Sequence, residues 1–402
     1  MLFNNYLLFA GILSFILVYN ISRWLLNNRI INEALLLAGN LILILQFVKE
    51  HTYLVLAGIS LVVFVGARLL QKKKSKLLFA FLLSLIVILF SVRNYPYLQD
   101  LLSDTFLDFI TAPVLSVQKL GLSYILFRFV HFLIESKRGT IHDSNFFTFL
   151  NYIFFFPTIL AGPIDNYKNF HFWMTNKRKG YTFSLALAGV SRILIGGVKT
   201  MILVPIIIQE ATDYTILVGS YGPILGVLLS LFCYSLYIYL DFSGYCDIAI
   251  GTAYMLGIKT PENFNNPYFA SNLSVFWKKW HMTFSNFLLA YVFKPIIQLL
   301  NFTIRIKARL PITIMAYVFT FTICGLWHGD KINFVYWGLW HGIGLALNKI
   351  WTIQLEPKWM LSKKYFYKPA SVFLTFSFVT VGWGFFHYSQ QELIEIFNLI
   401  QE

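Results

Sequence analysis

Long apolar runs, separated by short polar segments, cover most of this chain. Most of the runs approach the roughly 17–25 residues that a helix needs to cross a lipid bilayer. The strict alternation that a transmembrane barrel requires is absent from the sequence. The pattern therefore predicts an all-α integral membrane protein with about 11–13 transmembrane or re-entrant helices. The expected spans lie near residues 2–20, 33–48, 53–70, 77–92, 109–134, 145–163, 183–208, 217–240, 283–301, 311–327, 333–351 and 366–388.

Two apolar runs need a separate interpretation. The 245–257 stretch is short for a span, so we expect it to be re-entrant or packed inside the protein. The first run has no positive flank before it and no small-residue cleavage site after it. This favours a retained span over a removable signal.

Composition supports a membrane protein over a soluble one. The 402 residues are 57% hydrophobic and only 12% charged, so we interpret residues 1–402 as a single polytopic membrane domain. Residues 1–110 are leucine-rich spans with few buried polar groups, as expected of scaffold helices. Between 115 and 350, Gly, Pro, Asn, Asp, His and Trp occur in apolar surroundings, so this region is the predicted catalytic core. Residues 351–402 are a predicted C-terminal helix and tail.

The net charge of +14 is concentrated in short clusters of lysine and arginine. Loops rich in these residues usually stay cytoplasmic. We therefore expect the 71–76 loop in the cytoplasm, the N-terminus outside, and the acidic loop with Asp100, Asp104 and Asp108 outside as well. Because no soluble basic face exists, nucleic-acid binding is a poor explanation of the charge. Anionic lipid headgroups and an acidic protein partner at the cytoplasmic surface remain as alternatives.

No metal site or bound cofactor is predicted. Cys233, Cys246 and Cys324 have no paired spacing, which argues against a disulfide framework or a metal site. Cys246 or Cys324 as an acyl-carrying nucleophile is an alternative, although buried structural thiols are far more common. The chain has no Gly-x-Ser-x-Gly elbow, no His-Glu-x-x-His, no P-loop and no Cys-x-x-Cys.

Two tryptophan–histidine pairs stand out at the edges of apolar runs, Trp280-His281 and Trp327-His328. A charge at the bilayer centre costs roughly 2.5–3.5 kcal/mol, so ionisable groups there mostly line a cavity or do chemistry. Taken alone, the aromatic and basic segment 276–283 is typical of a membrane-interface belt, but a belt needs no imidazole. A neutral imidazole suits a general base, because its pKa is close to working pH. We predict that His328 and His281 are catalytic.

Two polar segments precede the first of these histidines. Asp241 follows an aromatic-rich span, and Gly244 permits a turn, so the segment is either a capped helix end or a cluster that orients substrate or imidazole. In 261–268, two prolines bracket Asn263, Asn265 and Asn266, whose amides can fix a carbonyl or a hydroxyl. We expect these residues, with Trp280 and Trp327, to support the site.

The segments YLDFSGYCDIAIG (239–251), GIKTPENFNNPY (257–268), FWKKWHMTFS (276–285) and GLWHG (325–329) occur in this order. As a set they resemble the membrane-bound O-acyltransferases, over about residues 115–350. GLSYILFRFVHFLIESKRG (121–139) and FFPTILAGPIDNYKNF (155–170) resemble the branch that transfers D-alanine to teichoic acids. DFSGYCDIAIG and VGWGFFHYSQQEL (381–393) resemble the branch that O-acetylates alginate and peptidoglycan. Both branches usually carry an Arg-Asp pair where this chain reads Leu288-Leu289-Ala290-Tyr291.

The resemblance implies a central buried reaction chamber reached from both sides of the membrane. It implies that His328 is the catalytic base, that His281 is the second active-site histidine and that His341 is structural. In the D-alanyl branch the donor is a thioester on the phosphopantetheine arm of a small carrier protein. Such carriers are acidic, so we expect Lys278 and Lys279 to contribute to docking.

These observations predict a multi-pass enzyme of the bacterial cell membrane that moves an acyl group to a hydroxyl of a cell-envelope polymer. The expected group is D-alanyl and the expected polymer teichoic acid, with an accessory acceptor protein as another partner. The alternative reaction is O-acetylation of an exported polysaccharide or peptidoglycan. A transporter of envelope precursors, with histidines as relays, is the alternative of another class, and the absence of inverted repeats argues against it.

Overall fold

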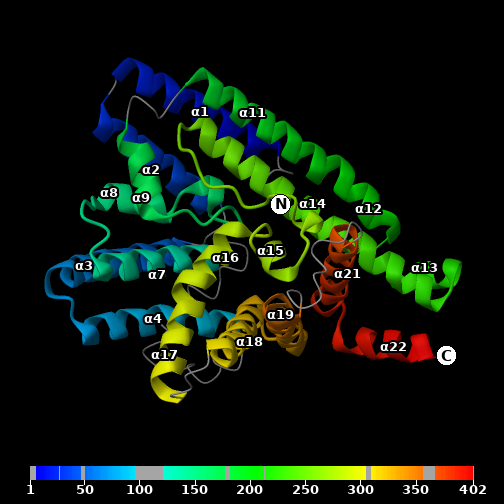
Figure 1. Cartoon of the computed structure of the whole chain (residues 1–402). Helices are drawn as coiled ribbons and strands as arrows, with labels where there is room; N and C mark the ends of the chain where they lie inside the picture. Colours follow the sequence, from blue (N-terminus) through cyan, green and yellow to red (C-terminus); the bar gives the residue numbers. More distant parts are fainter. Residues whose placement is uncertain are drawn as a thin grey trace. The chain divides into compact units, whose positions relative to one another are not determined.

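The structure is a computed structural model that describes residues 6–26, 28–46, 50–95, 121–176, 182–211, 213–304, 309–355 and 367–401. Within these ranges every regular element is a helix (Figure 1), which confirms the all-α prediction. Seven helices of the described part are long and apolar enough to cross a membrane, and two shorter apolar helices accompany them. The acidic loop at 100–108 lies outside the described residues.

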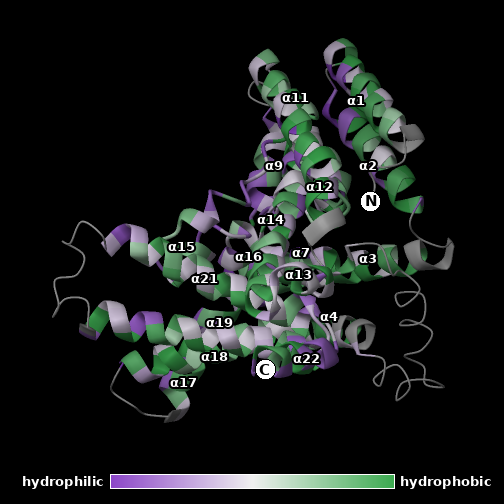
Figure 2. Ribbon diagram, turned by 90° about the vertical axis from the view of Figure 1, so that its right-hand side faces the viewer, coloured by the Kyte–Doolittle hydropathy of each residue, from purple (hydrophilic) through white to green (hydrophobic). Residues whose placement is uncertain are grey.

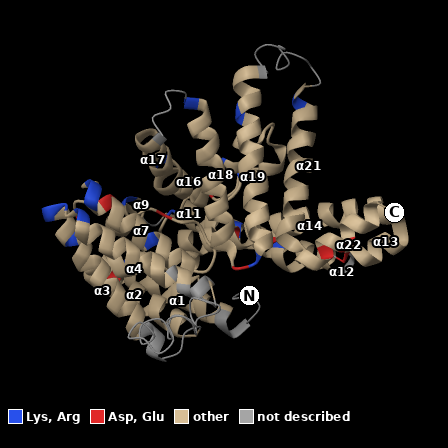
Figure 3. Ribbon diagram, turned by 90° about the horizontal axis from the view of Figure 1, so that it is seen from below, with Lys and Arg blue, Asp and Glu red and all other residues tan. Residues whose placement is uncertain are grey.

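The distribution of side chains agrees with a membrane protein. Figure 2 shows hydrophobic residues on most turns of the long helices, whereas the segment around α9 is more hydrophilic. Figure 3 shows Lys and Arg mainly near helix ends. Because the bilayer offers no water to buried backbone groups, helices that satisfy their own hydrogen bonds are the form expected here.

The chain forms two compact units, Met1–Gly196 with Tyr245–Pro261 and Gly197–Gly244 with Glu262–Glu402. The helices of the first unit are α1 (Tyr6–Leu26), α2 (Arg29–Leu45), α3 (Glu50–Lys73), α4 (Lys76–Asn94), α7 (Leu122–Arg138), α8 (Phe146–Ile153), η2 (Phe156–Thr158), α9 (Tyr167–Thr175) and α11 (Phe183–Gly197). Those of the second are η3 (Val198–Leu203), α12 (Val204–Ala211), α13 (Tyr214–Tyr221), η4 (Pro267–Phe269), α15 (Leu273–Trp277), α16 (Met282–Leu288), η5 (Leu289–Phe293), α17 (Lys294–Ile304), α18 (Arg309–His328), α19 (Ile332–Ile350), η6 (Trp351–Leu355), α21 (Tyr367–His387) and α22 (Gln390–Gln401). Helix α14 (Pro223–Met255) contributes to both.

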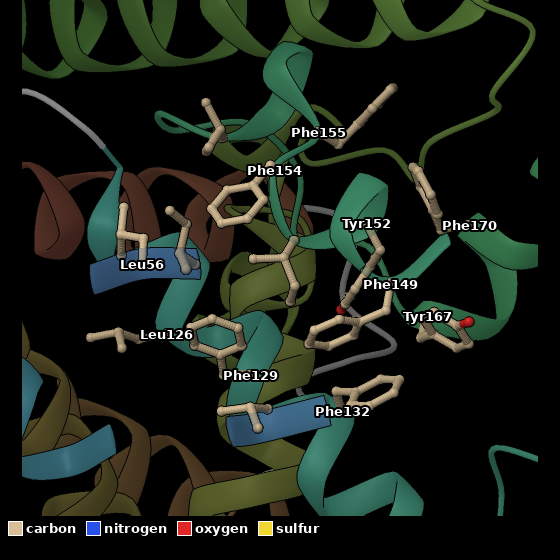
Figure 4. Close-up of a cluster of buried hydrophobic side chains, with 14 of the residues drawn as sticks. Leu56, Leu126, Phe129, Phe132, Phe149, Tyr152, Phe154, Phe155, Tyr167 and Phe170 are labelled. Atoms are coloured by element: carbon tan, nitrogen blue, oxygen red, sulfur yellow. The ribbon is translucent and has the colours of Figure 1, made fainter. Parts of the chain in front are cut away.

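The first unit packs around an aromatic core (Figure 4), in which α3, α4 and α7 pack against one another. The rings of Phe132 and Phe149 are 4.5 Å apart, and Tyr152 meets Tyr167 edge-on at 5.5 Å. Offset and edge-on aromatic pairs of this kind contribute about 0.5–1.5 kcal/mol beyond their buried area. Aromatic packing therefore stabilises the first unit where α7, α8 and α9 meet.

A buried arginine explains why the expected 145–163 span is not one helix. Arg128 of α7 donates hydrogen bonds to the carbonyls of Tyr152 at 3.0 Å and Ile153 at 2.7 Å, and to Thr158 Oγ1 at 2.6 Å. The last carbonyls of a helix have no partner within it. Because the guanidinium supplies those partners, α8 can end at Ile153 inside the protein, and the prediction of a continuous span was wrong there.

The predicted helix-breaking stretch 161–165 is irregular in the structure. At its end, the carboxyl group of Asp165 accepts a hydrogen bond from Asn166 N at 2.8 Å. Asn169 Nδ2 donates to both oxygens of the same carboxyl group, at 3.0 and 2.8 Å. Burial raises the pKa of Asp165 to about 7, against the opposing effect of the bonds from Asn169. Side-chain bonds thus replace the missing helical ones in this segment.

Helix α14 corrects a second expectation. The aromatic-rich span does not end at Asp241, and Gly244 makes no turn, because the helix continues to Met255. The 245–257 stretch is its buried continuation, as one of our two alternatives anticipated. Within the first unit, Gly251 lies so close to α11 that an added Cβ would be 2.5 Å from the carbonyl oxygen of Gly189. Tertiary packing here sustains a helix that local composition suggested would stop.

The topology of the first unit can be tested at the loop between α3 and α4. Ser75 caps α4 by accepting a hydrogen bond from Leu78 N at 3.2 Å. A Ser75→Cys variant should be labelled by an impermeant maleimide only after the cells are opened, because lysine-rich loops stay cytoplasmic. Gln46 offers the matched control, because it is exposed at the C-terminal end of α2, on the side of the membrane that the predicted topology places outside. Gln46→Cys should therefore be labelled on intact cells. Labelling of Ser75→Cys on intact cells would overturn the predicted orientation.

Candidate active site

The first candidate histidine lies in a tight turn that two loop segments build. The amide of Asn265 donates to the carbonyl of Lys279 at 3.0 Å, and the amide of Met282 donates to that of Asn263 at 2.8 Å. Between these bonds His281 adopts a left-handed conformation, with φ of 43°, and starts α16. Such backbone costs about 1–3 kcal/mol and persists where the surroundings hold it. The turn thus directs a buried imidazole inward.

Asn263 fixes how His281 is protonated. Its Oδ1 lies 3.2 Å from Thr283 N and 2.9 Å from Thr283 Oγ1. A backbone amide only donates, so the Asn263 atom that faces it must be the oxygen, which only accepts. His281 Nδ1 is 3.1 Å from that same oxygen, so Nδ1 carries the proton. In the neutral ring the lone pair is then on Nε2.

Aromatic rings connect this imidazole with the second tryptophan–histidine pair. Phe242 meets His281 edge-on with ring centres 4.8 Å apart, and Phe284 lies 5.0 Å away on α16. Phe284 packs on Trp327 at 4.6 Å, and Trp327 on His328 at 4.4 Å. The two imidazoles are close enough to interact electrostatically. The second unit therefore brings both predicted histidines into one apolar cluster.

Three helices of the second unit hold His328. It is the last residue of α18, and Gly325 one turn earlier lets α19 approach, since an added Cβ would lie 2.1 Å from the carbonyl oxygen of Phe334. Trp337 of α19 meets the His328 ring edge-on at 5.1 Å, and Phe386 of α21 does so at 4.9 Å. The edges of these two rings hold the half-buried imidazole in place.

A cavity of about 150 Å³ adjoins the cluster in the second unit. Phe284 belongs to both, because its ring contacts His281 and also lines the cavity. The wall of the cavity is mainly apolar and contains a few polar side chains, among them the exposed Lys278. The lining residues are Ser274, Trp277, Lys278, Phe284, Ser285, Asn286, Leu288, Leu289, Phe293, Tyr317, Thr320, Phe321 and Leu345.

A sequence model of the membrane-bound O-acyltransferase family matches residues 36–391. The chain belongs to this family. It is 31% identical to the teichoic acid D-alanyltransferase of Bacillus subtilis (strain 168), over 66% of this chain and 68% of that protein. It is 28% identical to the teichoic acid D-alanyltransferase of Streptococcus thermophilus over the same shares. It is 27% identical to the probable alginate O-acetylase AlgI of Pseudomonas fluorescens, over 66% of this chain and 50% of that protein.

The membership confirms an O-acyltransferase and a multi-pass membrane protein of a bacterial family. The transporter alternative is thereby set aside. The roles of individual residues in this O-acyltransferase stay predictions, and the structure shows which of them lie together: His281, His328, Asn263 and Trp327.

The other predicted site residues of the O-acyltransferase contact groups other than the two imidazoles. Trp280 packs on Trp383, with ring centres 4.9 Å apart, in the aromatic core of the second unit. Asn265 and Asn266 are exposed; the amide of Asn265 donates to the carbonyl of Lys279, and the carbonyl of Asn266 accepts from the amide of Phe269. Asp241 is half-buried in the middle of α14 and interacts electrostatically with Tyr237. Of the two lysines, Lys278 lines the cavity, whereas Lys279 is half-buried and does not.

His341 has different surroundings. It is 0% exposed, and neither ring nitrogen has a hydrogen-bond partner among the described residues. Trp277 and Trp337 enclose the ring, with centres 5.0 and 5.1 Å away. An imidazole without polar partners acts as an apolar packing unit. The structural role of His341 stays a prediction, and these apolar surroundings support it.

Sequence reasoning missed the aromatic partners of the two candidate histidines. Phe284 is three residues after His281 on the same helix face, so helical spacing offered a signal for it. Phe242 lies inside the segment 239–247 that we singled out for Asp241 instead. Phe386 comes from a distant helix, and no local pattern indicates that it meets His328.

Proposed function

We propose that this O-acyltransferase moves a D-alanyl group from a carrier-protein thioester to a hydroxyl of a cell-envelope polymer such as teichoic acid. The similarity to teichoic acid D-alanyltransferases supports the acyl group and the acceptor. The observation that carries the proposal is the junction between a cavity lined by Lys278 and a pair of imidazoles, of which His281 is buried and His328 is half-buried. It offers an entry for a thin donor arm and a base where the arm ends.

In the proposed reaction His328 takes the proton of the acceptor hydroxyl while the oxygen attacks the thioester carbonyl. The tetrahedral intermediate then collapses, the C–S bond breaks, and the departing sulfur takes the proton from the imidazolium. The ester and the free thiol are the products, and the base is neutral again. The aromatic rings around the half-buried His328 limit the access of water, which would compete with the polymer hydroxyl.

The tautomer of His281 determines which hydrogen bond its ring can make to the substrate. With the proton on Nδ1, the neutral ring presents a lone pair at Nε2 and accepts a hydrogen bond. It therefore suits binding of a substrate O–H or N–H better than donation of a hydrogen bond to an oxyanion. Asn263 acts on the reaction through His281 and is a positioning residue.

The cavity suits the end of a phosphopantetheine arm. Its wall is mainly apolar, with side-chain hydroxyls and amides at Ser274, Ser285, Asn286 and Thr320 that can bond to the amides of such an arm. Lys278 at the exposed edge would meet the acidic surface of the carrier. Complementary charge of this kind mainly speeds encounter and weakens as salt rises.

Carrier docking can be tested directly. The double variant Lys278→Glu with Lys279→Glu should retain less phosphopantetheine-loaded carrier in a pull-down, because it reverses the charge at the cavity edge. Wild-type retention should also fall between low and high ionic strength. Lys72→Glu with Lys73→Glu makes the same charge change on another exposed cluster and should bind as wild type. Unchanged retention in the Lys278 and Lys279 variant would remove these residues from the dock.

O-acetylation remains the alternative reaction, because the probable alginate O-acetylases are similar to this chain as well. Leu288 and Leu289 also line the cavity with apolar groups at the place where both branches usually carry an Arg-Asp pair. Absence of any carrier retention by the wild type would favour acetylation over D-alanylation.

A further inference from the structure

A cavity in the described part of the first unit is remote in sequence from the candidate catalytic residues. It has a volume of about 600 Å³ and lies between α1, α2 and α9. Nothing in the proposed acyl transfer uses it. Its lining residues are Leu17, Tyr19, Asn20, Ile21, Arg23, Trp24, Arg29, Asn32, Glu33, Trp173 and Met174.

The cavity lies at the expected level of lipid headgroups. Helix α1 carries the membrane-spanning segment Phe9–Leu26, and the cavity is built around the end of that segment. Trp24 in its last turn is 81% exposed, as is typical of tryptophans that anchor a helix at the membrane interface. Leu17 and Ile21, also exposed, form an apolar strip that leads from the cavity along α1.

Two arginines give the cavity an anion-binding end. Arg29 pairs with Glu33 through one N–H at 2.6 Å, and Arg23 donates one N–H to the carbonyl of Leu256 at 3.0 Å. A guanidinium carries five N–H donors, so both have further capacity. Glu33 is already engaged, since its other oxygen accepts from Thr148 at 3.1 Å. Planar guanidinium groups are well matched to phosphate oxygens.

An asparagine acceptor indicates that the ligand also carries a donor. Asn20 Nδ2 donates to the carbonyls of Ile16 and Met255, both at 2.9 Å, which fixes the orientation of the amide. Asn20 Oδ1 is buried with no hydrogen-bond partner among the described residues, as is Asn32 Oδ1. Buried acceptors normally have a donor. A hydroxyl of the ligand would supply one.

We infer that this cavity binds the headgroup of an anionic phospholipid that bears hydroxyls, with its phosphate on Arg23 and Arg29. The headgroup hydroxyls reach Asn20 and Asn32, and an acyl chain follows the apolar strip of α1. A choline headgroup has neither hydroxyls nor net negative charge, so the site discriminates against it. The lipid would join α1, α2 and α9 at the membrane interface, independently of which acyl group the enzyme transfers.

Native mass spectrometry of the full-length protein in detergent tests this inference. With phosphatidylglycerol and phosphatidylcholine offered at equal concentration, the wild type should retain phosphatidylglycerol about tenfold better, because the choline ammonium offsets the charge of the phosphate and the choline headgroup has no hydroxyl for Asn20 and Asn32. Arg23→Gln with Arg29→Gln should abolish the preference. Lys72→Gln with Lys73→Gln removes the same charge elsewhere and should keep it.

The single variant Arg29→Gln is a control for misfolding, because Arg29 lies at the exposed start of α2 and pairs with Glu33 one turn later on the same helix. It should weaken the preference while the protein stays monodisperse. An unchanged preference in the double arginine variant would overturn the site. Displacement of the lipid by an excess of inorganic phosphate would overturn the lipid assignment and identify a site for free phosphate instead.

Discussion

Replacing His328 by alanine should abolish acyl transfer while the protein still inserts and accumulates in the membrane. General base catalysis contributes about 10²–10⁴-fold, and the proposed mechanism has no second group to take the hydroxyl proton at that place. The ring is held by Trp337 and Phe386 from two other helices, so its removal leaves the backbone of α18 in position. Polymer modification, measured as acyl groups released by mild base, is the readout.

His341→Leu provides the matched control. This variant also removes an imidazole from the aromatic region of the second unit. The nitrogens of the His341 ring, however, have no hydrogen-bond partner in the described part of the structure. Deleting unpaired polar atoms from an apolar site costs little and can be favourable. We therefore expect activity close to that of the wild type. Greater sensitivity at His341 than at His328 would show that the base has been assigned to the wrong histidine.

The hydropathy pattern was sufficient to predict the helical class and the place of His328. A long apolar run that stops at His-Gly-Asp has one simple interpretation, a span that ends there, and α18 does end at His328. The same reasoning failed for α14. Asp241, Ser243 and Gly244 look like a helix terminus, but the helix continues because its next turns pack against α11. Local composition does not contain that information.

The asparagines show a different limit. Asn263, Asn265 and Asn266 are alike in type and lie within four residues of one another, so the sequence offers no reason to prefer one. The structure separates them, because backbone bonds in the turn bury Asn263 against His281 and leave the other two exposed. The aromatic contact of Phe386 with His328 could not be predicted from the sequence either, because it depends on how α21 packs on α19.

Replacing His281 by alanine should lower kcat by about 10²-fold or more, and the effect should extend to its positioning residue. Asn263→Ala removes the acceptor that keeps the proton on Nδ1, so the neutral ring can place its proton on Nε2 instead. Loss of an outer partner that orients an imidazole typically costs about 10–100-fold. The deficit should be in kcat rather than in KM, because the ring remains but presents the wrong atom.

Two further variants separate this role from simple structural support. Thr283→Val removes the hydroxyl that also bonds Asn263 Oδ1, at 2.9 Å, but keeps the histidine contact, so it should retain most activity. Asn263→Asp restores an acceptor for Nδ1–H and should recover kcat relative to Asn263→Ala. Its carboxylate also stabilises the protonated imidazole, which moves the acid limb of the rate profile to higher pH. Equal losses in Thr283→Val and Asn263→Ala, with no shift of the pH profile in Asn263→Asp, would reduce Asn263 to a loop-stabilising residue.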